Sequence, residues 1–190
     1  MSHSISMTDP FPEHPFWRFS CLVYQDRSLK SACLNLQDHL DMNVNIILFG
    51  CWLAANGRGR LQTTDFTKLE QLIAIWHQSI TSKLRQFRQQ LGRQVAANDN
   101  FNLISAVQQE ELSAEHVEQL MLAQRAASIL PRTRTGIQKA CDAANSLQNY
   151  AHSLDVNLCL QERQWFADIL QVIFNRVSAV NIHQLCGVTQ

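Results

Sequence analysis

The chain contains little of what interrupts helices. It has only six glycines and four prolines in 190 residues, and three of those prolines lie within the first fifteen residues. Strict alternation of apolar and polar residues, which marks a half-buried strand, is scarce. Long stretches of helix-forming residues remain, and they predict the all-α class. We expect a compact helical bundle of about six or seven helices.

The chain also lacks an excess of charge of either sign. Its 16 basic and 16 acidic residues give a formal net charge of zero, which removes the electrostatic argument for nucleic acid or an anionic membrane as partner. The longest apolar run, residues 44–55, is much shorter than the roughly 20 residues of a transmembrane helix. The first residues do not resemble a secretory signal. We therefore expect a cytoplasmic protein that binds neither nucleic acid nor membrane.

Clusters of metal-binding residues are absent from the sequence pattern. The six cysteines stand far apart, without the paired spacing of a zinc site or the density of a disulfide framework. No histidine pair has the helical spacing of a metal ligand set. We expect no metal and no cofactor, and we expect Cys21, Cys33, Cys51 and Cys141 to be buried thiols.

Apolar periodicity and capping residues predict the individual helices. A short helix begins at Pro15, and further helices are expected at about 27–40, 44–55, 65–92, 101–130 and 158–179. Asn43 caps the third helix, which ends in an Asn-Gly-Arg-Gly turn, and Thr135 with Gln138 forms a capping box for a helix after Pro131. Gly50 marks a close crossing with another helix.

The helix at 65–92 has the clearest apolar face. At 100° per residue, one sector of about 120° collects most of its large apolar side chains; they are Phe66, Leu69, Leu72, Ile73, Trp76, Ile80, Leu84, Phe87 and Leu91. With the helix at 101–130 it forms a long hairpin. In that hairpin, the basic C-terminal end of the 65–92 helix lies beside four acidic residues of the other helix, which predicts ion pairs within the chain. The four are Glu110, Glu111, Glu115 and Glu118.

The domain organisation follows from these elements. Residues 1–14 are predicted to be a mobile N-terminal arm, and residues 15–180 a single helical domain. Within this domain, a helix pair at 136–180 is expected to pack on the core at 15–130, because two amphipathic helices alone bury too little surface to be stable. Residues 181–190 are expected to fray or to form one further turn.

Three ordered motifs resemble a known family. They are "FWRFSCLVY" (16–24), "LNLQDHLDMNVNIILFGCWLA" (34–54) and "LRQFRQQL" (84–91). Together they are similar to a proteobacterial all-helical family of unknown function with the motifs WxFSxxxY, LQD, VNxxLFxxWL and LRxxRR. Gln89 replaces the second arginine of the last motif. The resemblance covers roughly residues 15–125 and implies neither an activity nor a set of site residues.

A few polar residues stand out as candidate ligand-binding residues. Asp38 and Asp41 share a helix face, but they lack the additional acids of a magnesium motif. His77, Arg85 and Arg88 follow the edge of the apolar face, and either arginine is positioned to pair with one of the two aspartates at the base of a cleft. This group is interpreted either as a buried ion pair that fixes helix register or as an anion or ligand site.

No pattern in the sequence assembles a catalytic group. Ser20 lacks the glycine-flanked turn of a hydrolase nucleophile, and the glycines at 57 and 59 are too few for a phosphate loop. We therefore expect a non-enzymatic protein-binding or adaptor module with an unknown protein partner, and the sequence leaves open whether the chain also forms a homo-oligomer. The alternative is a small-molecule or anion sensor, or an enzyme, with a pocket near Asp38, His77, Arg85 and Arg88. A lipid or apolar cofactor lined by tryptophans is a third reading.

Overall fold

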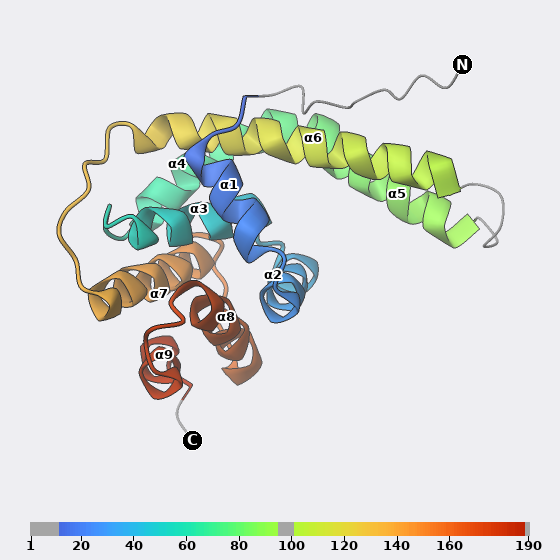
Figure 1. The fold of residues 1–190 in the computed structure, drawn as a ribbon. Helices are drawn as coiled ribbons and strands as arrows, with labels where there is room; N and C mark the ends of the chain where they lie inside the picture. Colours follow the sequence, from blue (N-terminus) through green and yellow to red (C-terminus); the bar gives the residue numbers. More distant parts are fainter. Residues whose placement is uncertain (1–11, 95–100, 189–190) are drawn as a thin grey trace, which may run out of the picture.

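The computed structural model describes residues 12–94 and 101–188, where its regular structure is entirely helical (Figure 1). The elements are α1 (Pro15–Val23), α2 (Arg27–Leu40), α3 (Val44–Ala55), α4 (Thr63–Trp76), the π-helical segment η1 (His77–Thr81), α5 (Ser82–Gln94), α6 (Phe101–Ala126), α7 (Gly136–Ser153), α8 (Leu160–Ile173) and α9 (Ala179–Cys186). The predicted all-α class is confirmed. Helices α4 and α5 are continuous through η1 and correspond to the single helix expected at 65–92. Helix α9 is the one helix of the described residues that the sequence did not predict.

Helix α3 is the centre of the core. Its residues from Asn45 to Ala54 are all buried, and the Asn43 side chain caps its start by accepting from the amides of residues 45 and 46. The turn that ends α3 contains Gly57, whose φ of +70° favours glycine and whose missing Cβ leaves room for the carbonyl of Arg132. The carbonyl of Gly57 also accepts a hydrogen bond of 2.8 Å from the Arg132 amide. This contact fastens the loop between α6 and α7 to the core.

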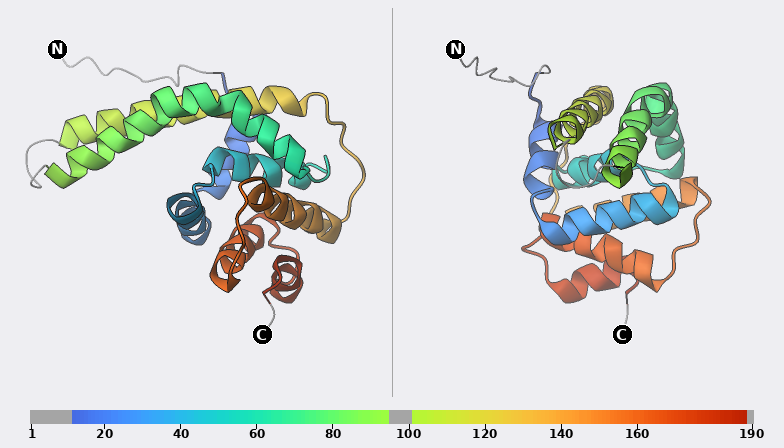
Figure 2. Two further views of the ribbon diagram at one scale, coloured as in Figure 1. Left: turned by 180° about the vertical axis from the view of Figure 1, so that it is seen from behind. Right: turned by 90° about the vertical axis from the view of Figure 1, so that its right-hand side faces the viewer.

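Helix α7 crosses α3 at Gly50, as the sequence indicated. A Cβ built on Gly50 would lie 3.5 Å from the Cβ of Ser146, so the two backbones are close at that point. The predicted capping box of Thr135 and Gln138 begins α7. Small side chains on its inner face, among them Ala140, Ala143, Ala144 and Ala151, are buried. Figure 2 shows α7 lying on the opposite side of α3 from α6.

The last described residues are better ordered than a frayed tail. Helix α8 packs against α2, and α9 packs against both α8 and α7. Ser178 caps α9, Gly187 ends it in a left-handed conformation, and Ile182 and Cys186 are buried. Of the two alternatives for the residues after 180, fraying is therefore wrong up to residue 188, and further helix is what the structure shows, through Cys186. A serine cap and a terminal glycine are both signals of helix ends in the local sequence.

The α5–α6 hairpin extends away from the body of the molecule (Figures 1 and 2). Its connection, residues 95–100, lies outside the described residues. Helix α6 ends at Ala126 and not at residue 130. None of the helices in the described ranges has the length and apolar character to cross a membrane.

The predicted N-terminal arm lies mostly outside the described residues, which begin at residue 12. His14, which we had placed in that arm, belongs to the folded part. Its Nδ1 accepts a hydrogen bond of 3.3 Å from the amide of Trp17 and so caps α1. Its ring also lies 5.4 Å from that of His116 on α6, measured between centroids. The fold therefore begins at His14 or before it.

Candidate functional site

The π-helical segment η1 interrupts the helix that we expected to be regular over 65–92. A π-turn holds one residue more than an α-turn, so the residues after it are rotated by about 100°. The predicted apolar face consequently fails after α4: Ile80 is 38% exposed and Phe87 is 46% exposed. Arg85 and Arg88, which the sequence placed at the edge of this face, turn toward α6 instead.

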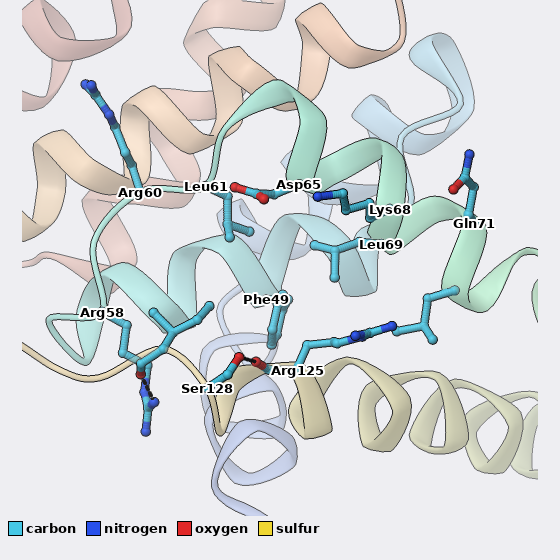
Figure 3. Close-up of a pocket in the computed structure, with 12 residues that line it drawn as sticks. Phe49, Arg58, Arg60, Leu61, Asp65, Lys68, Leu69, Gln71, Arg125 and Ser128 are labelled. Carbon is cyan, nitrogen blue, oxygen red and sulfur yellow. Dashed lines mark hydrogen bonds between the residues drawn. The ribbon is translucent and has the colours of Figure 1, made fainter.

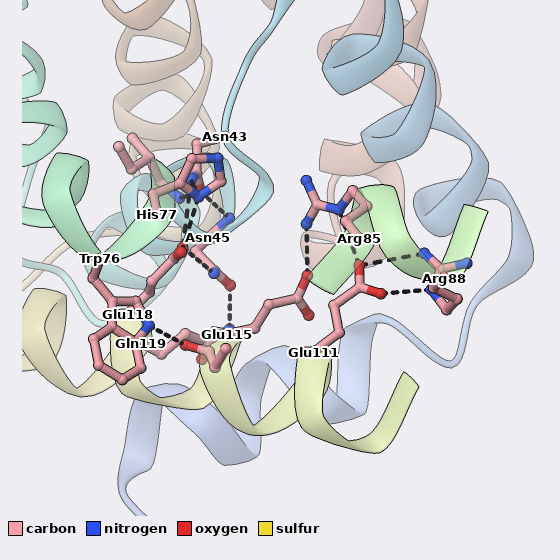
Figure 4. Close-up of polar contacts among 12 residues, drawn as sticks. Asn43, Asn45, Trp76, His77, Arg85, Arg88, Glu111, Glu115, Glu118 and Gln119 are labelled. Carbon is pink, nitrogen blue, oxygen red and sulfur yellow. Dashed lines mark hydrogen bonds and ion pairs between the residues drawn. The ribbon is translucent and has the colours of Figure 1, made fainter. Parts of the chain in front are cut away.

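Both arginines form ion pairs with glutamates of α6 (Figure 4). Arg85 lies 3.0 Å from Glu111 through Nε and 2.8 Å from Glu115 through Nη2. Arg88 holds both oxygens of Glu111. The predicted pairing of basic and acidic residues within the hairpin is thus confirmed. The suggested pairing of the arginines with Asp38 is not seen among the described residues.

A buried polar network continues from these ion pairs toward the core. Glu118 is fully buried, and its carboxylate lies 2.9 Å from Nδ1 of His77. The side-chain amides of Asn45 and Asn43 donate to the same carboxylate at 2.9 and 3.4 Å. Gln119 in turn donates to the amide oxygen of Asn45 at 2.9 Å. The network joins α3, η1 and α6 around one carboxylate.

Burial and hydrogen bonding compete in setting the protonation of this network. Burial alone raises the pKa of Glu118, but the hydrogen bond with His77 and the other donors outweigh it, and its pKa is lowered. The pKa of His77 is raised chiefly by its hydrogen bond to Glu118. Both shifts favour a charged histidine beside a charged glutamate.

A second hydrogen-bonded group ties α7 to α4 and to the start of α3. The buried hydroxyl of Tyr150 donates to the carboxylate of Glu70 and accepts a hydrogen bond of 2.9 Å from the amide of Asn43. Burial raises the pKa of Glu70. Asn43 therefore links both groups, since its side chain reaches Glu118 and its backbone reaches Tyr150.

The ion pairs border a groove of about 870 Å³ between α1 and α2 on one side and the α5–α6 hairpin on the other. We call this the α2–α6 groove. Its lining includes Trp17, Tyr24, Lys30, Leu34, Asp38, Asn45, Arg85, Arg88, Glu111, Leu112 and Glu115, together with Gln25, Gln37, Gln89, Gln108, Gln109 and Gln119. Cys21, which we expected to be buried, is exposed and also lines it.

Glu111, Glu115 and Tyr24, which line the groove, have shifted pKa values. Burial raises the pKa of Glu115 despite the nearby Arg85. For Glu111, burial is outweighed by the hydrogen bonds from Arg88 and Arg85, and its pKa is lowered. Burial also raises the pKa of Tyr24, which keeps its hydroxyl protonated. One wall of the groove thus carries the ion-paired group of Arg85, Arg88 and Glu111 beside Glu115, a carboxyl whose pKa is raised.

The structure brings together three of the five predicted ligand-binding residues. Asp38, Arg85 and Arg88 line the α2–α6 groove. His77 belongs to the buried network beyond the groove lining. Asp41 ends α2 in a left-handed conformation, with φ of 54°, where its amide bonds to the carbonyl of Gln37.

Sequence reasoning missed the residues that complete the site. Glu111 and Glu115 were expected only as weak surface partners, and neither Asn45 nor Gln119 was considered. The spacing of Glu111, Glu115 and Glu118 over seven residues places all three on one helix face, and that was the signal available. No group of three potential metal ligands occurs among the residues that the structure describes.

The tryptophans pack within the protein. The Trp17 ring stacks on His116 with centroids 3.9 Å apart, and the indole N–H of Trp76 donates to the carbonyl of Ala114. Trp52 packs against Phe16, with centroids 5.3 Å apart. Trp52 is thus a buried core residue, whereas Trp17 and Trp76 are half-buried and pack against α6.

Comparison with known proteins gives one match. A family model described as "Protein of unknown function (DUF2390)" matches residues 15–122, more than half of the chain. The chain belongs to the DUF2390 family. Neither the curated proteins nor the solved structures contain a match.

Every residue that lines the α2–α6 groove lies within the DUF2390 match. The buried network at Glu118 also lies inside it, apart from the contribution of Tyr150. Helices α7, α8 and α9 come after the matched region and support α3 and α2 from the side away from the hairpin. In this DUF2390 protein, the helices after the matched region thus complete the core, and the groove is built from the matched region.

Proposed function

We propose that this DUF2390 protein is a binding protein whose α2–α6 groove holds an extended segment of a partner protein. The observation that supports this most directly is the composition of the groove, where balanced charges stand beside many side-chain amides. The proposal concerns recognition without catalysis.

The charges of the groove cancel. Lys30, Arg85 and Arg88 face Asp38, Glu111 and Glu115, three of each sign. Both arginines already hold carboxylates at hydrogen-bond distance, so a free anion would have to compete with bound partners. This balance favours an uncharged polar ligand over the anion that we had considered.

The amides of the groove suit a peptide backbone. Six glutamines line it, at positions 25, 37, 89, 108, 109 and 119. Each amide both donates and accepts, and an extended peptide offers N–H and C=O groups in alternation. Leu34 and Leu112 are partly exposed beside them, which gives apolar side chains of the segment a place to pack.

The wall of the groove is rigid before any ligand arrives. Arg85 joins two glutamates of α6, and Gln119 is fixed by Asn45 from the buried side. Side chains that are already ordered lose less entropy when a ligand binds. The alternative of a small-molecule site that includes His77 has less support, because His77 does not line the groove.

Selection of random linear peptides on phage against the full chain tests the proposal. A variant with Gln25→Ala, Gln108→Ala and Gln109→Ala removes three amides from the groove. A matched variant with Gln86→Ala, Gln90→Ala and Gln124→Ala removes three exposed amides that do not line it.

Selected peptides should bind the groove variant at least about tenfold more weakly than the unmodified chain, since each lost hydrogen bond contributes roughly 0.5–1.5 kcal/mol. They should bind the matched variant as they bind the unmodified chain. Failure to enrich any peptide, or equal losses in the two variants, would overturn the proposal.

A further inference from the structure

A second cavity lies on another side of the molecule and has a different character. It holds about 710 Å³ between α4, the turn after α3 and the end of α6. We call it the basic cavity. We propose that it binds a small organic anion with an apolar body, such as an alkyl or aryl carboxylate. This site is separate from the α2–α6 groove and does not depend on its function.

The floor of the basic cavity is apolar. Phe49 from α3, Leu61 from the turn and Leu69 from α4 are buried core residues that line it. Leu72 lies beside them and is half-buried. Figure 3 shows Phe49 and Leu69 between the side chains of Lys68 and Arg125. The apolar part of a ligand placed on this floor would be covered by apolar side chains and removed from water, which favours binding.

The rim of the basic cavity carries four cations and one carboxylate. The carboxylate of Asp65 is already used, since it accepts from the amide of Gln62 and caps α4. Arg58 is also used, because its guanidinium donates to the carbonyls of Ala126 and Ile129 at the end of α6. These two groups serve the ends of helices, and their charges are largely satisfied there.

The other three cations have no carboxylate partner among the described residues. Arg60, Lys68 and Arg125 line the basic cavity, and none forms an ion pair there. The chain as a whole has no net charge, so this unbalanced group of three cations makes one part of the surface locally positive. A cleft with cations of one sign over low-dielectric walls concentrates the field and attracts anions.

The shape of the site selects the class of anion. Lys68 and Arg125 lie on opposite sides of one apolar floor (Figure 3), so an anionic group at the rim has a cation on each side while the apolar body of the same ligand covers the floor. A nucleic acid presents phosphates along a line, which this closed group of cations does not match. The floor and the rim together fit an amphiphilic anion of modest size.

Calorimetric titration of the full chain with decanoate tests this proposal. Decan-1-ol serves as the uncharged counterpart of decanoate, and inorganic phosphate serves as an anion that has no apolar part. The test variant carries Lys68→Gln and Arg125→Gln, both at exposed positions. The matched control carries Arg27→Gln and Arg176→Gln, exposed residues that line neither cavity.

Decanoate should bind the unmodified chain and the matched control equally, and the test variant at least about tenfold more weakly, as expected for lost charge-assisted hydrogen bonds. Decan-1-ol and phosphate should each bind at least about tenfold more weakly than decanoate. The proposal is overturned if decanoate does not bind, if either other probe matches it, or if the matched control loses as much affinity as the test variant.

Discussion

Nδ1 of His77 lies 2.9 Å from the carboxylate of Glu118, which is fully buried. This contact joins the π-helical segment to the middle of α6, and the amides of Asn43 and Asn45 complete the surroundings of the carboxylate. It places a hydrogen-bonded ion pair at the base of the hairpin. The hairpin is therefore held at its inner end by polar contacts as well as by apolar packing.

Replacing Glu118 with alanine should destabilise the protein strongly. The change leaves His77, Asn43 and Asn45 without their shared acceptor in a buried setting, which costs about 3–5 kcal/mol of unfolding free energy. Urea denaturation followed by circular dichroism measures the loss. Glu110→Ala, at an exposed position on the same helix, should change the value by less than about 0.5 kcal/mol. Similar values for the two variants would contradict this account of the network.

The contribution of His77 to stability should fall as pH rises. Its pKa is raised in the folded state, chiefly by the hydrogen bond to Glu118, with Glu70 acting in the same direction and Arg85 against it. The charged form is therefore favoured by folding, and its contribution is fully present below the ordinary pKa of about 6.5 and lost above the raised value. Unfolding free energies of the protein and of His77→Gln should converge through that window. A difference that grows with pH would contradict the assignment.

His14 should show the opposite pH dependence. Burial lowers its pKa, as does the nearby His116, so folding favours the neutral ring, which accepts from the amide of Trp17. Its contribution is present above the ordinary pKa of about 6.5 and is lost as pH falls through the lowered value. Hydrogen exchange at the Trp17 amide, corrected for its intrinsic pH dependence, should accelerate in acid. Loss of this acceleration is expected in His14→Asn, where an uncharged cap replaces the ring.

Deleting one residue from the π-helical segment should be tolerated. Removal of the exposed Ser79 lets η1 become a regular α-turn, and the residues after it keep their orientation because the extra residue of the π-turn has gone. Removal of the exposed Gln86 from α5 instead rotates Arg88 away from Glu111 and should cost about 1–3 kcal/mol. Thermal unfolding of the two deletion variants compares them directly. If the variant without Ser79 were less stable than the variant without Gln86, η1 would not contain the extra residue of a π-turn.

The sequence was sufficient to predict most of the fold. Asn43, the Asn-Gly-Arg-Gly turn and the Thr135 capping box each set a helix boundary through backbone hydrogen bonds that depend on local sequence. Such signals act over a few residues, so they can be recognised without knowledge of the rest of the molecule. Gly50 was likewise predictable as a crossing point, because a glycine in a buried helix commonly marks a place where another helix approaches the backbone closely.

The candidate site was predicted only in part, because its geometry depends on the π-turn. A regular wheel placed Ile80 and Phe87 inward, whereas the structure turns Arg85 and Arg88 inward. One extra residue in a helix leaves no clear mark in the apolar pattern. The π-turn is favourable here because α6 supplies partners for the side chains that the turn rotates. The location of the groove therefore required tertiary structure.

The most direct test of the account is to map a selected peptide on the chain by its effect on backbone amide chemical shifts. Binding in the α2–α6 groove should shift the amides of residues around Tyr24, Gln37 and Gln108, which line it from the end of α1, from α2 and from α6. The amides around Lys68 and Arg125 in the basic cavity should stay unchanged. Shifts confined to the basic cavity, or no peptide that perturbs the groove, would contradict the central claim.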